Sequence, residues 1–313
     1  MKSLSKSILL GTSIGDALGV PVEFLSREEL DRNPVNDMQG YGTHNQPAGT
    51  WSDDTSMSLC LADSLCDGYN LQDIADKFVQ WMDNGLWTPY GFVFDIGIAT
   101  SCAICNIKKG ISPVMTGMNG EYDNGNGSLM RILPLLIHIH SLLQKERIQK
   151  IEEVSSITHS HSRSILGCII FMEFARNLLS HSIEDSFMLM QKDVCSLIEQ
   201  VTSLKNESVH FNRILLSSFK DYKSIHRKEI YSSGYVVHTL EASLWCIANS
   251  LNFKDAVLSA VNLGNDADTT GAVTGGLAAL VYGYESIPQE WLNRLARKND
   301  LICLAERLEA ELQ

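Results

Sequence analysis

Residues 265–280 read Asn-Asp-Ala-Asp-Thr-Thr-Gly-Ala-Val-Thr-Gly-Gly-Leu-Ala-Ala-Leu. Two carboxylates, Asp266 and Asp268, stand at the start of a run of small and apolar side chains. Small side chains allow close packing, so this stretch predicts a helix deep in the core with two acids at its mouth. Buried carboxylates need a cation or several hydrogen-bond donors, because an unpaired buried charge is costly. The stretch therefore predicts a core helix and a functional site together.

Apolar residues recur at helical spacing along most of the chain, and convincing two-residue alternation is scarce. Ile74, Phe78 and Trp81 form one such series, and Ile165 and Ile169 belong to another. We expect helices at residues 2–10, 15–20, 54–66, 71–82, 93–108, 127–143, 148–158, 163–180, 184–203, 236–250, 254–262, 268–283 and 288–297, with a last one near 300–311. The sequence therefore predicts an all-α protein.

Gly, Asn and Pro cluster at 33–50 and 117–127, which indicates loops, and loops often carry functional sites. The most polar stretch, 204–229, is expected to be a solvated surface excursion. No internal repeat and no linker divides the chain, so residues 1–313 are predicted to form a single domain.

Composition narrows the class of protein. Of 313 residues, 44% are hydrophobic, which is ample for a full core. The formal net charge of -12 at pH 7 argues against nucleic acid as a general partner, because such a partner favours a basic face. The first residues do not resemble a signal peptide, and no stretch is apolar for long enough to span a membrane. We expect a cytoplasmic protein without a membrane partner, and a monomer.

Eight cysteines are scattered through a chain that is too long to need disulfide staples, so reduced core thiols are expected. Cys102 and Cys105 have C-x-x-C spacing, which occurs in metal and redox sites. No second pair completes a zinc site. Two residues three positions apart on a helix are therefore the favoured interpretation.

A second acidic cluster, Ser52-Asp53-Asp54-Thr55, has two interpretations. Ser, Asp and Thr are typical helix N-caps, and acids there also suit the helix dipole. A cap needs only one such residue, however, and four oxygen-bearing side chains in a row also suit a metal. Neither cluster contains His or Cys, so their hard oxygen donors favour Mg²⁺, Mn²⁺ or Ca²⁺. An EF-hand is excluded because no bidentate Glu stands at the required position after Asp266.

Two glycine-rich segments flank these acids. Glycines at 11, 15 and 19 indicate close helix packing, within which Asp16 is an anomaly, and Glu23 taken alone is expected to be a surface acid. The segment Gly125-Asn126-Gly127-Ser128-Leu129-Met130-Arg131 starts a predicted helix, where exposed backbone N–H groups could bind an anion such as phosphate. Asn-Gly is also ordinary turn chemistry, and the segment fits neither a P-loop nor a Rossmann fingerprint.

His159 and His161 lie between two predicted helices, where a ligand could reach them. A His-x-His pair can bind zinc, but no third nitrogen or sulfur ligand is placed by the sequence. A polar contact to substrate is the better functional interpretation.

These motifs follow one another in a fixed order: 15–19 with Glu23, then 52–55, 125–131, His159 and 264–271. In content and order they resemble the ADP-ribosylglycohydrolases, and in particular the bacterial branch that includes the dinitrogenase reductase-activating glycohydrolases. The resemblance runs from about residue 6 to residue 283. It implies a single-domain, orthogonal all-α bundle with two Mg²⁺ ions, or Mn²⁺, in a cleft. It also implies removal of ADP-ribose from a modified protein side chain or a small adduct.

The resemblance also implies functions for individual residues. It implies these metal ligands: Ser52, Asp53, Asp54, Asp266, Asp268 and Thr269. It implies these substrate contacts: Gly125, Asn126, Gly127, Ser128, Met130, His159 and Tyr235. Ser52 stands where several relatives carry Thr, and both side chains offer a hydroxyl oxygen. Glu23, at the rim of the metal centre, and Asp95, near the scissile bond, are the two candidates for the catalytic acid-base, and the sequence does not choose between them.

The implied chemistry is hydrolysis of a glycosidic bond, in which carboxylates activate water and stabilise an oxocarbenium-like transition state. Two metal ions would grip the vicinal ribose hydroxyls. Two rival classes stay open: a crystallin-like protein that binds ADP-ribose without cleaving it, and a phosphoesterase that attacks the diphosphate. The linkage stays open too. An arginine adduct is preferred over serine-linked or O-acetyl ADP-ribose because the bacterial branch gives the best resemblance.

Overall fold

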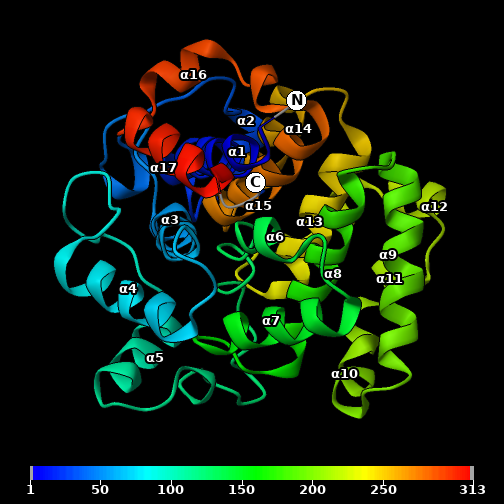
Figure 1. Ribbon diagram of the computed structural model, residues 1–313. Coiled ribbons are helices and arrows are strands. Elements are labelled where there is room, and N and C mark those ends of the chain that lie inside the picture. The colour runs from blue at the N-terminus through cyan, green and yellow to red at the C-terminus, as the bar shows by residue number, and fades with distance from the viewer. Residues whose placement is uncertain (1–2, 311–313) are drawn as a thin grey trace.

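Helices α1 (Leu4–Gly19) and α15 (Ala267–Tyr282) pack together near the centre of the computed structural model, which describes residues 3–310 (Figure 1). Their backbones almost touch: a Cβ atom added to Gly15 would lie 2.0 Å from the carbonyl oxygen of Gly271. Only glycine, which has no Cβ, permits such an approach. The small-residue stretch at 265–280 therefore forms the predicted core helix.

The prediction of two separate helices at 2–10 and 15–20 was wrong, because α1 is continuous. Gly11 and Gly15 do not interrupt it, since both lie against the backbone of α15 and tertiary packing outweighs their low helix propensity. Residues 2 and 311, at the outer ends of the first and last predicted helices, lie outside the described residues.

The bounds of the other helices follow. The α-helices are α2 (Arg27–Arg32), α3 (Asp53–Leu65), α4 (Leu71–Asn84), α5 (Ile98–Lys108), α6 (Leu135–Ile139), α7 (Gln144–Ser156), α8 (Ser162–Leu178), α9 (Ile183–Ile198), α10 (Thr202–Glu207), α11 (Asn212–Leu216), α12 (Phe219–Lys223), α13 (Val236–Asn249), α14 (Phe253–Val261), α16 (Gln289–Arg294) and α17 (Lys298–Ala310). Short 3₁₀ turns are η1 (Val20–Val22), η2 (Gly42–His44), η3 (Pro113–Met115), η4 (Ser208–Phe211), η5 (Arg227–Glu229) and η6 (Tyr284–Ser286).

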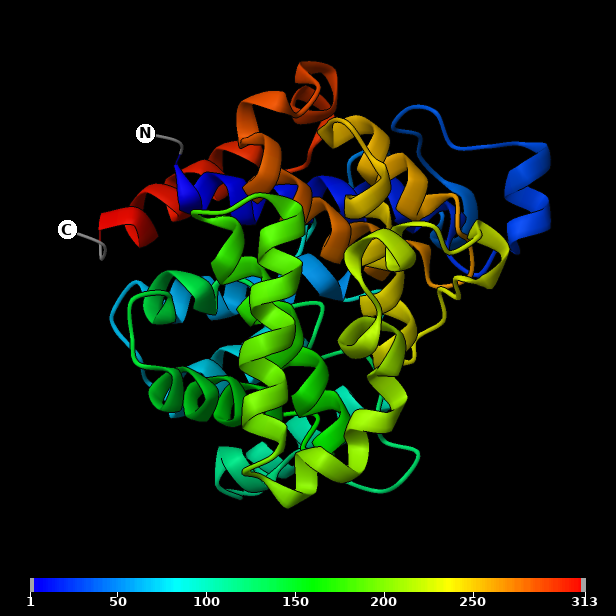
Figure 2. The same cartoon turned by 90° about the vertical axis from the view of Figure 1, so that its right-hand side faces the viewer.

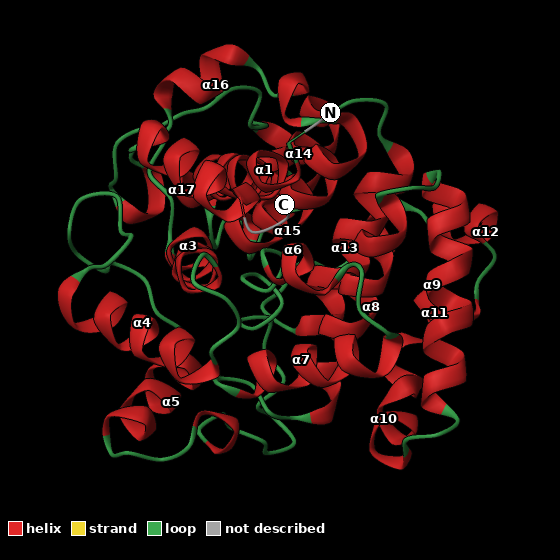
Figure 3. Ribbon diagram, in the orientation of Figure 1, coloured by secondary structure: helices red, strands yellow, loops and turns green. Residues whose placement is uncertain are grey.

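The helices cross one another in a bundle that is not parallel. In Figure 1, α1, α3 and α15 are seen nearly end-on while α9 runs vertically, and in Figure 2 α1 runs across the view. Helices and loops make up all of residues 3–310, with only three isolated β-bridges (Figure 3). This confirms the predicted all-α, orthogonal bundle. Within the same residues, no helix combines the length and apolar character that crossing a membrane would require.

One hydrophobic core connects elements from both ends of the chain. Its largest buried side chains include Trp51, Trp81 and Trp291. The first and last helices are also tied by polar contacts, because the Ser5 backbone N–H donates to Glu309 Oε2 at 2.9 Å. Residues near the two ends thus pack as one unit.

A buried ion pair connects α7 with α8. Arg147 Nε and Nη2 donate to the two carboxylate oxygens of Glu173, each at 2.9 Å, and Arg176 Nε reaches Glu173 Oε2 at 3.2 Å. Such bidentate geometry satisfies both oxygens of the acid at once. The charge of Glu173 is therefore compensated inside the protein.

Three predicted helices are shorter than expected. The one predicted at 127–143 was wrong for most of its length: only α6 is helical, because Pro134 disfavours helix for the residue before it. The one predicted at 93–108 begins at Ile98, since Gly97 is its N-cap and the residues before it are non-helical. The one predicted at 184–203 ends at Ile198, where α9 stops before α10 begins. Other predicted helices agree with the structure within a few residues.

Several short helices were not predicted. Helix α2 begins with a capping box formed by Ser26 and Glu29, a sequence signal that was present but not used. The segment 204–229 contains short helical turns, several of whose apolar side chains are buried, Phe211 and Tyr222 among them. Its prediction as a solvated excursion of a single domain stays a prediction.

All eight cysteines are free thiols. Four of them are buried, as expected: Cys60, Cys66, Cys168 and Cys246. Cys102 and Cys105 are instead exposed on α5, three residues apart on a helix, as the favoured interpretation of the C-x-x-C spacing predicted.

Candidate active site

A cavity of about 700 Å³ opens where η1, the start of α3, the start of α15 and the loop 117–127 come together. Its lining includes acids from five separate parts of the chain: Glu23, Asp53 with Asp54, Asp95, Asp123 and Asp266. A cavity of this size, with convergent charged groups, is the usual form of an active site.

The two acidic clusters meet at one wall of this cavity. Thr269 Oγ1 donates to Asp54 Oδ2 at 3.2 Å, a contact between residues 215 positions apart in the chain. Ser52 Oγ donates to the same oxygen at 3.1 Å. The clusters occupy the N-terminal ends of α3 and α15, where the helix dipoles favour negative charge. The N-cap interpretation also holds, because Ser52 Oγ accepts a hydrogen bond from the Asp54 backbone.

Asp16 supports the first acidic cluster, residues 52–55, through hydrogen bonds. Its carboxylate accepts hydrogen bonds from the backbone N–H groups of Ser52 and Thr55, at 3.0 Å each, and from Thr55 Oγ1 at 2.6 Å. Complete burial raises the pKa of Asp16 to about 7, although these hydrogen bonds oppose the shift. The sequence marked Asp16 as an anomaly in a packed helix without giving it a role, and the structure places it as the support of the loop before α3.

Glu23 is fixed against the second cluster through the backbone. Phe24 N–H donates to Asn265 O at 2.6 Å, and Asn265 N–H donates to Leu25 O at 2.7 Å. Both Phe24 (φ 66°) and Asn265 (φ 58°) have positive φ, which for a bulky residue such as Phe is strained backbone of the kind found at functional sites. Glu23 is only 5% exposed, so the expectation of a surface acid was wrong.

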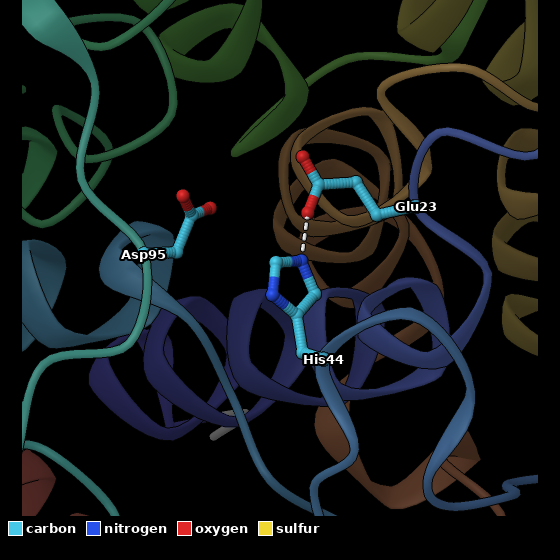
Figure 4. A group of neighbouring side chains, drawn as sticks. All are labelled: Glu23, His44 and Asp95. Atoms are coloured by element: carbon cyan, nitrogen blue, oxygen red, sulfur yellow. Dashed lines mark hydrogen bonds and ion pairs between the residues drawn. The ribbon is translucent and has the colours of Figure 1, made fainter.

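Glu23 is paired with His44, a residue that the sequence gave no reason to select. His44 Nε2 forms a short ion pair with Glu23 Oε2, and Asp95 is turned towards this pair (Figure 4). One ligand atom from each of the three residues lies within 4.8 Å of the others. The hydrogen bond to Glu23 raises the pKa of His44, while burial raises the pKa of Glu23 although His44 opposes it. His44 reaches the site from the predicted loop 33–50.

The acids of the site have too few partners for their charge. Burial, followed by the charge of neighbouring acids, holds the pKa values of Asp53, Asp54 and Asp268 well above their usual range. Asp54 Oδ1 is buried without a hydrogen-bond partner among the described residues. Carboxylate oxygens of Glu23, Asp266 and Asp268 lie within 4.8 Å of one another. An all-oxygen group of this kind, short of positive charge, fits a hard divalent cation.

The predicted substrate contacts are only partly on the cavity wall. The residues that line it are Gly125, Asn126, Gly127, Met130 and His159. Asn126 Nδ2 also donates to Asp266 Oδ2 at 2.6 Å, which joins the glycine loop to the acid cluster and opposes the rise in the pKa of Asp266 that burial causes. The loop thus contributes to the acidic wall as well as to the space beside it.

Two predicted contacts lie off this wall. Ser128 is fully buried, and its hydroxyl accepts a hydrogen bond from Ser155 Oγ at 2.9 Å. Tyr235 lines a smaller depression next to His238, while its neighbours Ser233 and Gly234 line the cavity. Among the predicted metal ligands, Ser52 and Asp268 stand directly behind the lining formed by the others.

An all-α bundle whose cleft brings together two acidic clusters of oxygen donors fits a metal-dependent hydrolase better than a nucleotide-triphosphate or zinc enzyme. The sequence profile of the ADP-ribosylglycohydrolase family matches residues 3–313. The chain belongs to this family and is an enzyme that hydrolyses a glycosidic bond of ADP-ribose.

Individual relatives agree with the family assignment. The chain is 37% identical to an ADP-ribosylarginine hydrolase, Tri1, of Pseudomonas putida, over 97% of this chain and 77% of the relative. It is 29% identical to the ADP-ribosyl-[dinitrogen reductase] glycohydrolase of Rhodospirillum rubrum, over 92% of this chain and 89% of the relative. A solved structure described as an ADP-ribosylglycohydrolase-related protein complex aligns with a TM-score of 0.80 at 28% identity, over 99% and 98% of the two chains.

Proposed function

We propose that the protein removes ADP-ribose from arginine side chains of modified proteins, in a reaction that depends on Mg²⁺. The observation that carries the proposal is the meeting of the two acidic clusters at the Thr269–Asp54 contact. One buried oxygen of Asp54 there has no hydrogen-bond partner within residues 3–310. Relatives named as ADP-ribosylarginine hydrolases, at 37% and 38% identity, support arginine as the acceptor.

The proposed ligands of two Mg²⁺ ions, with Mn²⁺ as the alternative, are Ser52, Asp53, Asp54, Asp266, Asp268 and Thr269. Divalent ions bound there would orient ribose hydroxyls and lower the pKa of a bound water. The chain's own contribution is a wall of negative charge on one side of the sugar. Such a wall stabilises the positive charge that develops on the ribose as the glycosidic bond breaks.

Glu23 is the preferred acid-base residue, and Asp95 is the alternative. Burial raises the pKa of Glu23 towards the working pH, which suits a group that must both accept and release a proton. His44 holds one oxygen of Glu23, leaving the other for water or substrate. Asp95 lines the cavity beside this pair, with a carboxylate oxygen within 4.8 Å of Glu23, so it is the alternative acid-base residue.

The glycine loop and His159 are proposed to receive the diphosphate and the ribose next to it. No helix begins at this loop, so the support for the proposal is the absence of side chains at Gly125 and Gly127, which lets a ligand approach the backbone. Tyr235 is proposed to flank the adenine from the neighbouring depression. Cytoplasmic location and a monomeric state stay predictions.

The test is to incubate purified protein and Mg²⁺ with arginine-linked, serine-linked and O-acetyl ADP-ribose, and to identify the products. Release of free ADP-ribose, fastest from the arginine adduct, is expected. A preference for the serine adduct would overturn the choice of acceptor, and AMP as product would indicate a phosphoesterase. Binding of ADP-ribose without turnover of any substrate would favour a crystallin-like binding protein.

A matched pair of variants separates the two acid-base candidates. Glu23→Gln and Asp95→Asn each remove one ionisable group while keeping its shape. The residue that acts as the acid-base should, when replaced, abolish the corresponding limb of the pH profile of kcat. If Glu23→Gln keeps the wild-type profile, the role passes to Asp95.

A further inference from the structure

Arg131, the last residue of the glycine-loop motif, is a completely buried cation that forms no hydrogen bond with a carboxylate of residues 3–310. Its Nη2 donates to Val154 O at 3.1 Å and to Thr158 Oγ1 at 2.8 Å, and its guanidinium carbon lies 4.6 Å from the ring centre of Phe78. Burial lowers the pKa of Arg131 to about 10, so the group is still charged at neutral pH. Burying a charge of this kind lowers the free energy of unfolding, so a functional role for Arg131 is expected.

The hydroxyl of Thr158 connects Arg131 to His159 through two hydrogen bonds, and this chain of three residues is called the relay below. Thr158 Oγ1 accepts the hydrogen bond from Arg131 and lies 2.9 Å from His159 Nδ1. The Thr158 hydroxyl has one proton to donate, and among the hydrogen bonds of residues 3–310 His159 Nδ1 is the one acceptor available to it. If Nδ1 carried the ring proton, this buried hydroxyl proton would have no acceptor there, so the geometry favours Nδ1 as acceptor and the ring proton of neutral His159 on Nε2.

His159 is neutral for two reasons. Burial lowers its pKa to about 3, and the positive charge of Arg131 acts in the same direction. An imidazolium, which would carry protons on both nitrogens, does not form at neutral pH. The hydrogen bond from Arg131 also polarises the Thr158 hydroxyl and so strengthens its donation to Nδ1.

The opposite edge of the ring faces the glycine loop and the cavity. A Cβ atom added to Gly127 would lie 2.6 Å from His159 Cε1 and 3.1 Å from Nε2, so glycine at this position makes room for the ring. His159 lines the cavity, and no hydrogen bond of the described chain uses its Nε2. The Nε2–H group is thus left as a donor for a ligand.

We propose that Arg131 and Thr158 are positioning residues, which fix His159 in its Nε2–H tautomer so that it presents a neutral hydrogen-bond donor to an oxygen acceptor in the cavity. The chemical class of that acceptor, a phosphate or ribose oxygen of ADP-ribose, rests on the proposed function. A neutral donor with a fixed proton recognises oxygen without adding a positive charge beside the acid cluster.

The tautomer can be observed directly. Long-range proton–nitrogen correlation spectra of the protein labelled with ¹⁵N-histidine distinguish a ring protonated at Nε2 from one protonated at Nδ1, and the His159 signals are assigned by their loss in His159→Gln. Wild-type protein is expected to show protonated Nε2 and unprotonated Nδ1 on His159 near neutral pH. Protonation at Nδ1 would overturn the proposal, and this measurement needs neither ligand nor an altered relay.

Binding tests the consequence. Thr158→Val keeps the shape of the side chain but removes the hydroxyl, and ADP-ribose, titrated calorimetrically, should bind about tenfold more weakly because one well-aligned hydrogen bond is no longer held in place. Thr158→Ser keeps the hydroxyl and should bind within about twofold of wild type. Near-UV circular dichroism at the titration temperature verifies that both variants are folded.

Two results would overturn the positioning role of Arg131 and Thr158: protonation of His159 at Nδ1, and wild-type affinity in Thr158→Val. Neither result decides whether the protein binds ADP-ribose at all. Wild-type affinity in Thr158→Val would show that the relay does not position His159 for the ligand. If wild-type protein itself binds no ADP-ribose, the proposed function fails, while the tautomer of His159 in the unliganded protein still decides the relay.

Discussion

Glu173, between α7 and α8, and Asp54, at the start of α3, are each 1% exposed, yet they are surrounded in opposite ways. Glu173 receives a bidentate pair of hydrogen bonds from Arg147 and a further one from Arg176. Asp54 receives hydrogen bonds from neutral hydroxyls and lies among other acids, and one of its oxygens has no partner in the described part of the chain. One carboxylate is neutralised by the protein, and the other is not.

The difference separates a structural charge from a functional one. A buried acid with two cations completes the packing around it, whereas a buried acid among acids weakens the folded state until something positive arrives. Active sites commonly lower stability in this way. The region around Glu173 should therefore respond to substitution through stability, and the region around Asp54 through activity.

The largest expected effect is on activity. Asp268→Asn and Asp266→Asn should each lower the rate of ADP-ribose release by roughly 1000-fold or more, because several kcal/mol of transition-state stabilisation is lost and each 1.4 kcal/mol is a factor of ten. With chelator present, Asp268→Asn should unfold at the wild-type temperature or higher, since a repelled charge is gone. Full activity in both variants would contradict the assignment of the site.

The region around Glu173 should show the reverse pattern. Glu173→Ala leaves the buried Arg147 without its partner and should lower the free energy of unfolding by about 3–5 kcal/mol, measured by urea denaturation. The folded variant should retain its kcat, because Glu173 does not line the cavity. Arg147→Met combined with Glu173→Met removes both charges and should restore a large part of the loss. A Glu173→Ala protein as stable as wild type would contradict the view that Glu173 is a structural charge.

A smaller effect comes from a buried group that is held neutral. His159 has a pKa of about 3 in the folded protein and about 6.5 when unfolded. The unfolded chain therefore binds the extra proton between these values, so the contribution of His159 is complete above pH 6.5 and is lost as the pH falls. Between pH 8 and pH 5 the loss should be about 2 kcal/mol.

Because other groups titrate in the same pH range, the effect of His159 is measured as the difference in pH dependence between wild type and His159→Gln. Urea denaturation of wild type and His159→Gln at both pH values should show a smaller acid effect in the variant. Parallel pH dependence in the two proteins would mean that His159 titrates normally in the fold.

The smallest effect is expected at the surface. Lys108 and Asp83 form an ion pair with 2.8 Å between Nζ and Oδ2, but both side chains are substantially exposed. Asp83→Asn should change the free energy of unfolding by less than about 1 kcal/mol, because water already solvates both charges. A loss as large as that of Glu173→Ala would show that ion pairing, rather than burial, governs the comparison.

Much of the architecture is present in the local sequence. Apolar spacing predicted most of the long helices, and the small-residue run after Asp268 predicted the core helix α15. The two acidic clusters were selected because hard oxygen donors gather there without His or Cys. Their placement in one cavity could be expected only through the resemblance to a family, since nothing within either cluster specifies its partner.

Other parts depend on contacts between distant segments. His44 lies in a loop with no motif, and its pairing with Glu23 follows from the fold of that loop over η1. Ser128 belongs to the glycine-loop motif, but its side chain turns into the core towards Ser155. The continuity of α1 depends on α15, which supplies the packing that its glycines lack. Each of these features is set by tertiary neighbours rather than by local pattern.

The glycine contact between α1 and α15 also determines when the protein can mature during synthesis. Helix α1 is synthesised well before the backbone surface that fits its glycines, because that surface belongs to residues 267–282. Until those residues emerge, the nascent chain has an uncovered glycine face and only half of its acidic cleft. The enzyme can therefore acquire its activity only after residues 267–282 have been synthesised.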